Sequence, residues 1–314
     1  MIYKGLSYTL RQPSRPKKPG KENTVTYQSC NLCPQACGVD RTAGQLGRCK
    51  MTHIPKVARV SLHLWEEPPV SGTNGSGTVF FSGCPLSCIY CQNHVISHGG
   101  KGEYFTEAQL TEAFLSLASE GAHNINLVTA THFLPTVIPA LKTAKSKGLS
   151  IPVVYNTSGY ETEASLKALE GLVDIYLTDL RYIKSDTAKA LSHAPDYPEV
   201  AKNAIAEMFR QTGGPCFTSE GMMQKGVIVR LLLLPGHLIE AKMALRYLYS
   251  TYGNGIYLSL MSQYTPISGM PVPLDRPVSA AEYRSFLSEA TRLGIEQAFV
   301  QDQASATTAF IPPF

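Results

Sequence analysis

The sequence predicts an α/β protein in which a small Cys-rich N-terminal module precedes a partial (β/α)6 barrel of the TIM type. Two observations support this fold class. From Gly77 onward, apolar β-rich runs alternate with helical patterns, and three cysteines directly follow the first of these runs. Strand–helix alternation builds βαβ units with a parallel sheet. Parallel barrels carry their chemistry on the loops that follow the strands, so the cysteines stand where a reactive site is expected.

The predicted strands are runs of apolar, β-branched or aromatic residues. They cover residues 78–82, 125–130, 151–155, 173–178, 226–234 and 255–261, with a weaker run at 297–301. Each of the first six runs is followed by a helical pattern, and the second and third of these helices are predicted to be short. This order corresponds to six βα units.

Two helices have clear start signals. The first is predicted to begin at Thr106, which forms a capping box with Gln109, and the last at Ser279, which forms one with Glu282. Gly294 is expected to end the last helix, because glycine readily adopts the left-handed conformation that closes a helix. The first and last helices are therefore fixed by local sequence alone.

Composition places few restrictions on partners. The chain has 314 residues, 44% of them hydrophobic and 17% charged, which is typical of a globular protein. No run approaches the roughly 20 apolar residues of a membrane span, and residues 1–21 have no apolar stretch that would form a secretory signal. We therefore expect a cytoplasmic protein with no membrane partner. Residues 1–21 are predicted to be a basic, flexible extension, residues 22–76 the Cys-rich module, and residues 77–314 the barrel.

The first cysteine set is Cys84, Cys88 and Cys91, spaced Cys-x3-Cys-x2-Cys. Cysteine thiolates are the usual ligands of iron–sulfur clusters. Three thiolates on one tight loop can hold three irons of a [4Fe–4S] cluster and leave the fourth iron open to a small molecule. The alternative is a zinc site, which prefers four ligands and would take its fourth from His94 or His98.

The second cysteine set is Cys30, Cys33, Cys37 and Cys49. Four thiolates can close a zinc or iron site or fully ligate a second [4Fe–4S] cluster, and the sequence does not decide between these. A chain with no bound metal here is the remaining alternative. Eight cysteines without a secretory signal argue for metal ligation and against a disulfide framework. Cys216 stands apart and is expected to be a free thiol.

The first cysteine set resembles the signature of the radical S-adenosylmethionine (SAM) superfamily. Together with the segments 153–159, 179–181 and 230–236, it is similar to the glycyl-radical activating enzymes, and most of all to the branch called pyruvate formate-lyase activating enzyme-like, or PflX-like. The resemblance runs from about Cys30 to the C-terminus. It implies that the partial barrel is of the radical SAM kind.

The resemblance also implies a reaction. In such oxidoreductases the amino and carboxylate groups of SAM bind the open iron of the [4Fe–4S] cluster, and reductive cleavage gives methionine and a 5′-deoxyadenosyl radical. The radical then takes a hydrogen atom from the substrate, which in the activating enzymes is a glycine of a partner protein. The implied partners are SAM, a one-electron donor of the flavodoxin or ferredoxin type, and a glycyl-radical protein.

The candidate SAM contacts follow from the same resemblance and from the ends of the predicted strands. They are Tyr90, Asn93, Thr131, His132, Asn156, Ser158, Asp179, Arg181, Arg230 and Gln263. Many radical SAM enzymes have a Gly-Gly-Glu turn after the second strand, and this chain has residues 128–132 in its place. Thr131 and His132 are therefore the candidates for the amino-group contact.

Several of these candidates have a physical reason of their own. Arg181 can bind the SAM carboxylate, because a guanidinium fork matches a carboxylate. Arg230 lies in an apolar strand, where a charge requires a ligand or a carboxylate partner. Asn156 and Ser158 either reach the ribose or cap the following helix. Before the first strand, Glu66 and Glu67 either approach the barrel mouth or belong to a solvated linker.

The sequence therefore predicts a radical SAM enzyme that abstracts a hydrogen atom, with activation of a glycyl-radical protein as its specific form. The alternative within this class is maturation of another peptide or of a small molecule. A zinc-binding adaptor is the distant alternative. We expect no nucleic-acid partner, because basic residues interleaved with aromatic residues do not occur beyond the first 21 residues.

Overall fold

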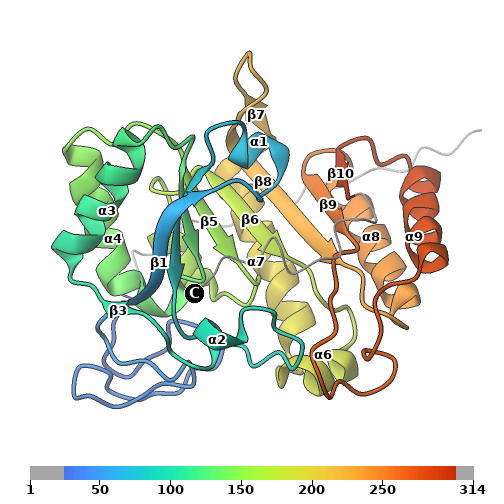
Figure 1. Cartoon of the computed structure of the whole chain (residues 1–314), viewed down its shortest axis with the longest axis horizontal. Helices are drawn as coiled ribbons and strands as arrows, with labels where there is room; N and C mark the ends of the chain where they lie inside the picture. The colour runs from blue at the N-terminus through green and yellow to red at the C-terminus, as the bar shows by residue number, and fades with distance from the viewer. Residues whose placement is uncertain (1–24, 302–314) are drawn as a thin grey trace, which may run out of the picture.

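The structure, a computed structural model, describes residues 25–301. The predicted basic extension of residues 1–21 lies outside the described residues. A mixed sheet has the strand order β10-β9-β8-β6-β5-β4-β2-β1-β3, and β7 (Cys216–Phe217) pairs with β8 off this path. Figure 1 shows the sheet curving around an interior, with α3 and α4 on one side and α8 and α9 on the other.

Seven strands of the sheet run parallel and form the partial barrel. They are β2 (Ser76–Phe81), β4 (Ile125–Val128), β5 (Val153–Thr157), β6 (Ile175–Asp179), β8 (Met223–Leu232), β9 (Tyr257–Met261) and β10 (Ala298–Val300). Each coincides within a few residues with one of the predicted apolar runs. The predicted α/β class with a central parallel sheet is confirmed.

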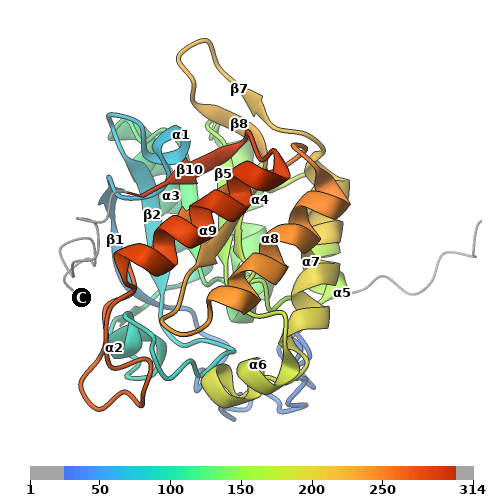
Figure 2. The ribbon, with the colours of Figure 1, turned by 90° about the vertical axis from the view of Figure 1, so that its right-hand side faces the viewer.

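Helices follow the strands; the longer ones cover the outer face of the sheet, whereas α2 lies at the carboxyl ends of the strands and lines the cavity there (Figures 1 and 2). They are α2 (His94–Ser97), α3 (Glu107–Ser119), α4 (Leu134–Ser146), α5 (Glu163–Ala168), α6 (Ser185–Ser192), α7 (Tyr197–Thr212), α8 (Leu238–Tyr252) and α9 (Ala280–Leu293). The capping boxes at Thr106 and Ser279 are both present, and Gly294 ends α9 with φ 80°. No helix among residues 25–301 is long and apolar enough to cross a membrane.

The prediction of a short second helix is wrong. Helix α4 has 13 residues, as many as α3. Its two prolines are the reason for the error. Pro135 lies in the first turn, where its missing N–H is not needed, and Pro139 removes only one bond, to the carbonyl of residue 135. The third helix, α5, is short as predicted, with six residues.

Strands β1, β3 and β7 have no counterpart in the prediction, and β1 is the longest of them. Strand β1 (Lys56–His63) pairs antiparallel with β2 and with the short β3 (Glu103–Tyr104). Its register shifts between Val57 and Arg59, and this irregularity breaks the alternation that would have marked a strand in the sequence. The sheet therefore begins inside the segment assigned to the N-terminal module, and the division at residue 76 stays a prediction.

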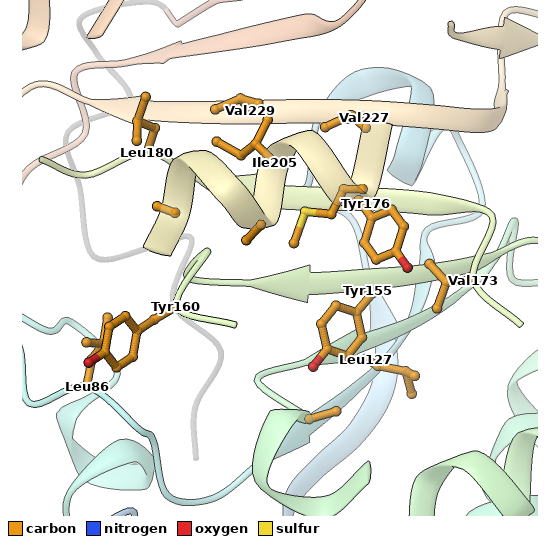
Figure 3. Packing of buried hydrophobic residues seen from close by; sticks show 14 of the residues in the cluster. Leu86, Leu127, Tyr155, Tyr160, Val173, Tyr176, Leu180, Ile205, Val227 and Val229 are labelled. Carbon is orange, nitrogen blue, oxygen red and sulfur yellow. The ribbon is translucent and has the colours of Figure 1, made fainter. Parts of the chain in front are cut away.

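The parallel strands bury both of their faces. On the outer face, Tyr155, Tyr176, Val227 and Val229 pack beneath α7, which contributes Ile205 (Figure 3). On the inner face, a second apolar cluster fills the base of the barrel. It consists of Val70, Val154, Ile175, Leu177, Met223 and Ile228. Val70 comes from α1 (Pro68–Ser71), so this short helix closes the base.

Substitution of Gly77 in β2 by Ala is predicted to lower the free energy of unfolding by about 1–3 kcal/mol. A Cβ there would lie 2.9 Å from Ala122 Cβ and 2.9 Å from the Asn124 carbonyl oxygen. The matched control is Gly214→Ala, because nothing lies within 4 Å of its Cβ position. Urea denaturation should show the control within about 0.5 kcal/mol of the parent. Equal effects of the two substitutions would contradict this account of the packing.

Candidate active site

A cavity of about 680 Å³ lies at the carboxyl ends of the parallel strands. Its walls come from the ends of the parallel strands, from the loop after β2 and from the segment between β1 and α1. This volume is within the range of ligand-binding pockets. Its location is the one that a parallel barrel uses for chemistry.

The three cysteines of the first set line this cavity. Cys88 is buried, and its sulfur accepts hydrogen bonds of 2.9 Å from Arg181 Nη1 and of 2.9 Å from Ser192 Oγ. Cys91 Sγ lies 3.3 Å from Ser97 Oγ. Sequence reasoning missed both serines, because no local motif marks them.

Electrostatics favour metal ligation at this loop over free thiolates. Burial raises the pKa of Cys84, and the neighbouring Cys88 and Cys91 raise it further. Burial also raises the pKa of Cys91. A bound metal replaces the thiol proton and thereby removes this obstacle to ionisation. The donor set is therefore suited to a thiolate-bound metal group.

The geometry of the cysteine sets can be compared with two kinds of metal group. Among residues 25–301, no three His, Cys, Asp or Glu side chains form a group that could hold a metal ion. In a [4Fe–4S] cluster each thiolate binds a different iron, so the cysteine sulfurs are spread around the space that the cluster occupies. The cavity beside Cys84, Cys88 and Cys91 provides open space next to these sulfurs.

Arg181 and Asp179 form an ion pair at the end of β6, with 2.6 Å between Arg181 Nη2 and Asp179 Oδ2. Both side chains line the cavity, and Arg181 links this pair to Cys88. The hydroxyl of Tyr197 in α7 accepts a hydrogen bond from the Arg181 N–H and donates one to the Ser158 carbonyl. Tyr197 thereby holds the ends of β5 and β6 together.

The structure brings most of the predicted SAM contacts into this cavity. Those that line it are Asn93, Asn156, Ser158, Asp179, Arg181, Arg230 and Gln263. Gln263 is tied on both sides: its carbonyl accepts from Gln92 Nε2, and its side chain accepts from Gln301 Nε2 at 2.9 Å. Their roles towards SAM are taken up under the proposed function.

Three predicted contacts do not line the cavity. Tyr90 is buried, with its hydroxyl 2.6 Å from that of Tyr182. After β4 the chain turns at Thr129, which has φ 59°, and the next residues form η1 (Thr131–Phe133). Thr131 then donates to Glu161, and His132 Nε2 lies 2.8 Å from the Ser82 carbonyl oxygen. Thr131 and His132 therefore lie behind the cavity wall.

Arg230 has the carboxylate partners that its apolar strand requires. Its guanidinium binds Glu67 through two bonds of 2.7 Å and also binds Glu66. Glu66 in turn accepts hydrogen bonds from the side-chain amides of Asn126 and Asn156. Burial raises the pKa of Glu67, but the Arg230 charge outweighs burial and holds this pKa below its usual value.

Glu66 and Glu67 thus belong to the cavity, and the alternative of a solvated linker is wrong. Both side chains are buried and line the cavity. Two carboxylates sharing one guanidinium leave a net negative charge in this region of the cavity. A pairing across 163 and 164 residues has no local signal in the sequence.

The second cysteine set packs beside the first. Cys30, Cys33 and Cys49 are buried and Cys37 is partly buried. The Cβ position of Gly47 lies 3.3 Å from Cys49 Sγ and 3.4 Å from Cys37 Sγ, so these two sulfurs flank one glycine. Burial raises the pKa of Cys33 to about 12. Burial also raises the pKa of Cys49, so Cys33 and Cys49 are difficult to ionise without a metal.

The loops of the two sets touch at Gly83, which has φ 82° and directly precedes Cys84. A Cβ on Gly83 would lie 2.7 Å from the Cys49 carbonyl oxygen and 2.6 Å from Met51 Cγ. Gln35 Nε2 also donates to the Pro85 carbonyl at 3.1 Å. Only glycine allows the two backbones to approach this closely.

Comparison with known proteins identifies the family. The model of the radical SAM superfamily matches residues 78–240, which is more than half of the chain. The chain therefore belongs to the radical SAM superfamily, which implies a [4Fe–4S] cluster and SAM. An uncharacterized protein of Methanocaldococcus jannaschii is 26% identical over 251 residues, covering 76% of this chain and 67% of that protein.

Solved structures show more distant likeness. SuiB of Streptococcus suis bound to S-adenosylmethionine has a TM-score of 0.49 and 9% identity, covering 70% of this chain and 48% of SuiB. The methylornithine synthase PylB has a TM-score of 0.49 and 14% identity, covering 69% of this chain and 60% of PylB. The chain thus spans about half to three fifths of the length of these proteins.

Replacement of Arg230 by Met is predicted to lower the free energy of unfolding by about 3–5 kcal/mol, because Glu66 and Glu67 would lose their shared counter-charge. The control is Arg276→Met, since Arg276 pairs with Glu282 and is 45% exposed. Its cost should stay within about 1 kcal/mol. Chemical denaturation measures both, and similar small losses would show that the buried pair is dispensable.

Stability should also depend on pH through Glu161, which is buried and accepts hydrogen bonds from Thr131 and Thr157. Burial raises the pKa of Glu161 from 4.5 to about 7. Folding therefore favours the protonated acid, and its stabilising effect is complete below pH 4.5 and is lost as the pH rises through 7. The loss amounts to about 3 kcal/mol.

Glu161→Gln should remove this pH dependence, since an amide stays neutral. We expect the variant to gain stability relative to the parent between pH 5 and pH 8, measured by urea denaturation at ~0.15 M salt. Glu112→Gln is the control, because the Glu112 side chain is 69% exposed. A parent-to-variant difference that is constant across this range would refute the assignment.

Proposed function

We propose that this radical SAM enzyme binds its [4Fe–4S] cluster at Cys84, Cys88 and Cys91 and cleaves SAM reductively to abstract a hydrogen atom from a substrate. The observation that carries the proposal is the common cavity. Three thiols on one loop and the Arg181–Asp179 pair face the same space at the carboxyl ends of the strands. Family membership supports the chemistry, and the donor set fits the group.

When bound, the cluster would supply the electron that splits SAM into methionine and a 5′-deoxyadenosyl radical. The chain's own residues hold and tune this site. Arg181 and Ser192 donate hydrogen bonds to Cys88, which stabilises negative charge on its sulfur. Ser97 lies in the same relation to Cys91.

For SAM itself we retain the predicted residues that line the cavity. Arg181 presents a guanidinium to the SAM carboxylate, and Asp179 fixes the orientation of that guanidinium. Asn156 and Ser158 at the end of β5 are the candidates for the ribose, with Asn93 and Gln263 at the walls. Arg230 binds Glu66 and Glu67 in the cavity wall, and we assign it no direct SAM contact. Tyr90, Thr131 and His132 are not retained.

For the substrate we propose a protein or peptide, with activation of a glycyl-radical partner as the specific reaction. The sequence resemblance to the PflX-like branch supports this reaction. The cavity walls include Trp65 and Val300, whose residues are 59% and 56% exposed, and Leu64, which precedes Trp65 in the chain, is 52% exposed. Exposed apolar side chains at a cavity are typical of a surface that receives another polypeptide. Maturation of another peptide or of a small molecule is the second candidate.

Two further parts of the proposal concern cofactors. A flavodoxin or ferredoxin would deliver the electron, because reductive cleavage requires one per turnover.

The second cysteine set would hold a metal centre of its own, either zinc or a second cluster. The buried sulfurs flanking Gly47 support this assignment.

Single Ala substitutions of Cys84, Cys88 and Cys91 should each abolish formation of 5′-deoxyadenosine from SAM under dithionite, because each removes a cluster ligand. The product is measured by chromatography after anaerobic reconstitution. Cys216→Ala is the matched control, since Cys216 is an exposed free thiol. It should retain parental activity.

Substitution of Cys30 or Cys49 should lower the metal content and leave SAM cleavage detectable. Undiminished 5′-deoxyadenosine in all three variants of the first set would rule out the proposed reaction. Loss of cleavage only in the variants of the second set would instead show that the SAM-binding cluster lies at Cys30, Cys33, Cys37 and Cys49.

A further inference from the structure

Large apolar and aromatic side chains gather at one side of the cavity. Trp65 comes from the segment between β1 and α1 and Val300 from the end of β10, and both line the cavity while remaining more than half exposed. These two residues define what we call the cavity mouth. The rings of Phe80 and Phe299 line the same cavity. Exposed apolar side chains gathered in this way indicate a surface that another segment or molecule covers.

The chain passes from the described residues into residues 302–314 at this mouth. Gln301 follows β10 directly and lines the cavity. Its N–H donates to the Tyr283 hydroxyl at 3.0 Å, and its side chain accepts from the Ser262 N–H at 3.0 Å. Because Gln301 is held on both its main chain and its side chain, the segment that follows it begins beside the cavity.

Residues 302–314 lie outside the described residues, but their composition suits an apolar surface. Asp302 is the only charged residue among them, and positions 310–314 read Phe-Ile-Pro-Pro-Phe. Proline fixes its own φ and restricts the residue before it, so such a run loses little conformational freedom on binding. Proline-containing segments commonly bind grooves lined by aromatic rings. The run at 310–314 therefore matches the aromatic lining of the cavity.

The length of this segment is sufficient to reach the mouth. An extended chain advances roughly 3.3 Å per residue, so Phe310 can lie up to about 30 Å from Gln301. Trp65 and Gln301 line the same cavity of about 680 Å³. Trp65 is therefore well within reach of residues 310–314 of the same molecule.

We propose that residues 310–314 bind across the cavity mouth against Trp65 and Val300 and cover it until a substrate displaces them. The binding itself requires neither SAM nor a metal. Its role in controlling access rests on the proposed function, because the covered cavity is the one assigned to SAM and to a protein or peptide substrate. A substrate that binds the same surface has to compete with the segment, which lowers its apparent affinity by the fraction of molecules with an open mouth.

The chain contains a natural reporter for this contact. Trp65 is the only tryptophan, so tryptophan fluorescence reports on the cavity mouth alone. The metal-free full chain is compared with a chain shortened to end at Gln301. Removal of the segment should shift the Trp65 emission to longer wavelength and raise its quenching by acrylamide, because water replaces apolar side chains. A synthetic peptide of residues 302–314, added to the shortened chain, should reverse both changes in a saturable manner.

Two full-length variants separate apolar binding from other effects of the segment. Phe310→Ser combined with Phe314→Ser should reproduce most of the change seen on removal, since this variant keeps the length and loses both rings. Ala304→Ser is the matched control, because it introduces the same residue type without removing a large apolar side chain. Its emission should equal that of the parent. If circular dichroism shows that the shortened chain does not fold, the comparison of these two variants decides.

Identical emission from the parent and from the variant that lacks both rings would overturn the proposal. An emission spectrum that changes with protein concentration would also overturn it, because the occupant of the mouth would then be a second copy of the chain. Both measurements are made on metal-free protein, so they do not depend on SAM cleavage.

Control of access is measured separately, after anaerobic reconstitution. The chain that ends at Gln301 should form 5′-deoxyadenosine faster than the full chain in the absence of substrate, because SAM enters an open mouth. Equal rates would overturn the role in access. Failure of both chains to form the product would contradict the proposed function and leave the fluorescence result intact.

Discussion

The buried contact of Arg230 with Glu66 and Glu67 fixes the interior of this barrel. It joins β8 to the segment between β1 and α1 across the space that the strands enclose. Val70 follows Glu67 closely in the chain and packs in the apolar cluster at the base of the barrel. The ion pair and the packing of this cluster therefore hold the same segment in place. Such pairs contribute little net stability but strongly penalise any arrangement that separates them. The cavity therefore has a polar wall of defined shape.

Above this polar wall the site is built from strand ends. The parallel register brings Asp179 beside Arg230 and Arg230 beside Ser259, so side chains from β6, β8 and β9 lie at one level. The loop after β2 brings the three cysteines to the same end of the sheet. Reactive groups distant in the chain meet because strand direction and register place them there.

Local patterns in the sequence were sufficient for the seven parallel strands, the capping boxes and the cysteine sets. They were insufficient where a backbone irregularity or a contact with a residue distant in the chain determines the local structure. The bulge in β1 hides its alternation, and the prolines of α4 imitate a break. The turn at Thr129 carries Thr131 and His132 away from the cavity. The partners of Arg230 depend on contacts that only the folded chain makes.

At Gly83 the loop of Cys84, Cys88 and Cys91 contacts the main chain of the loop that contains Cys49. Cys49 contributes its main chain to one side of this contact, and Cys84 follows directly on the other. A shift of the loop that contains Cys49 would therefore push sterically against the loop that contains Cys84. The position of the Cys49 main chain therefore limits the shapes that the loop of Cys84, Cys88 and Cys91 can adopt.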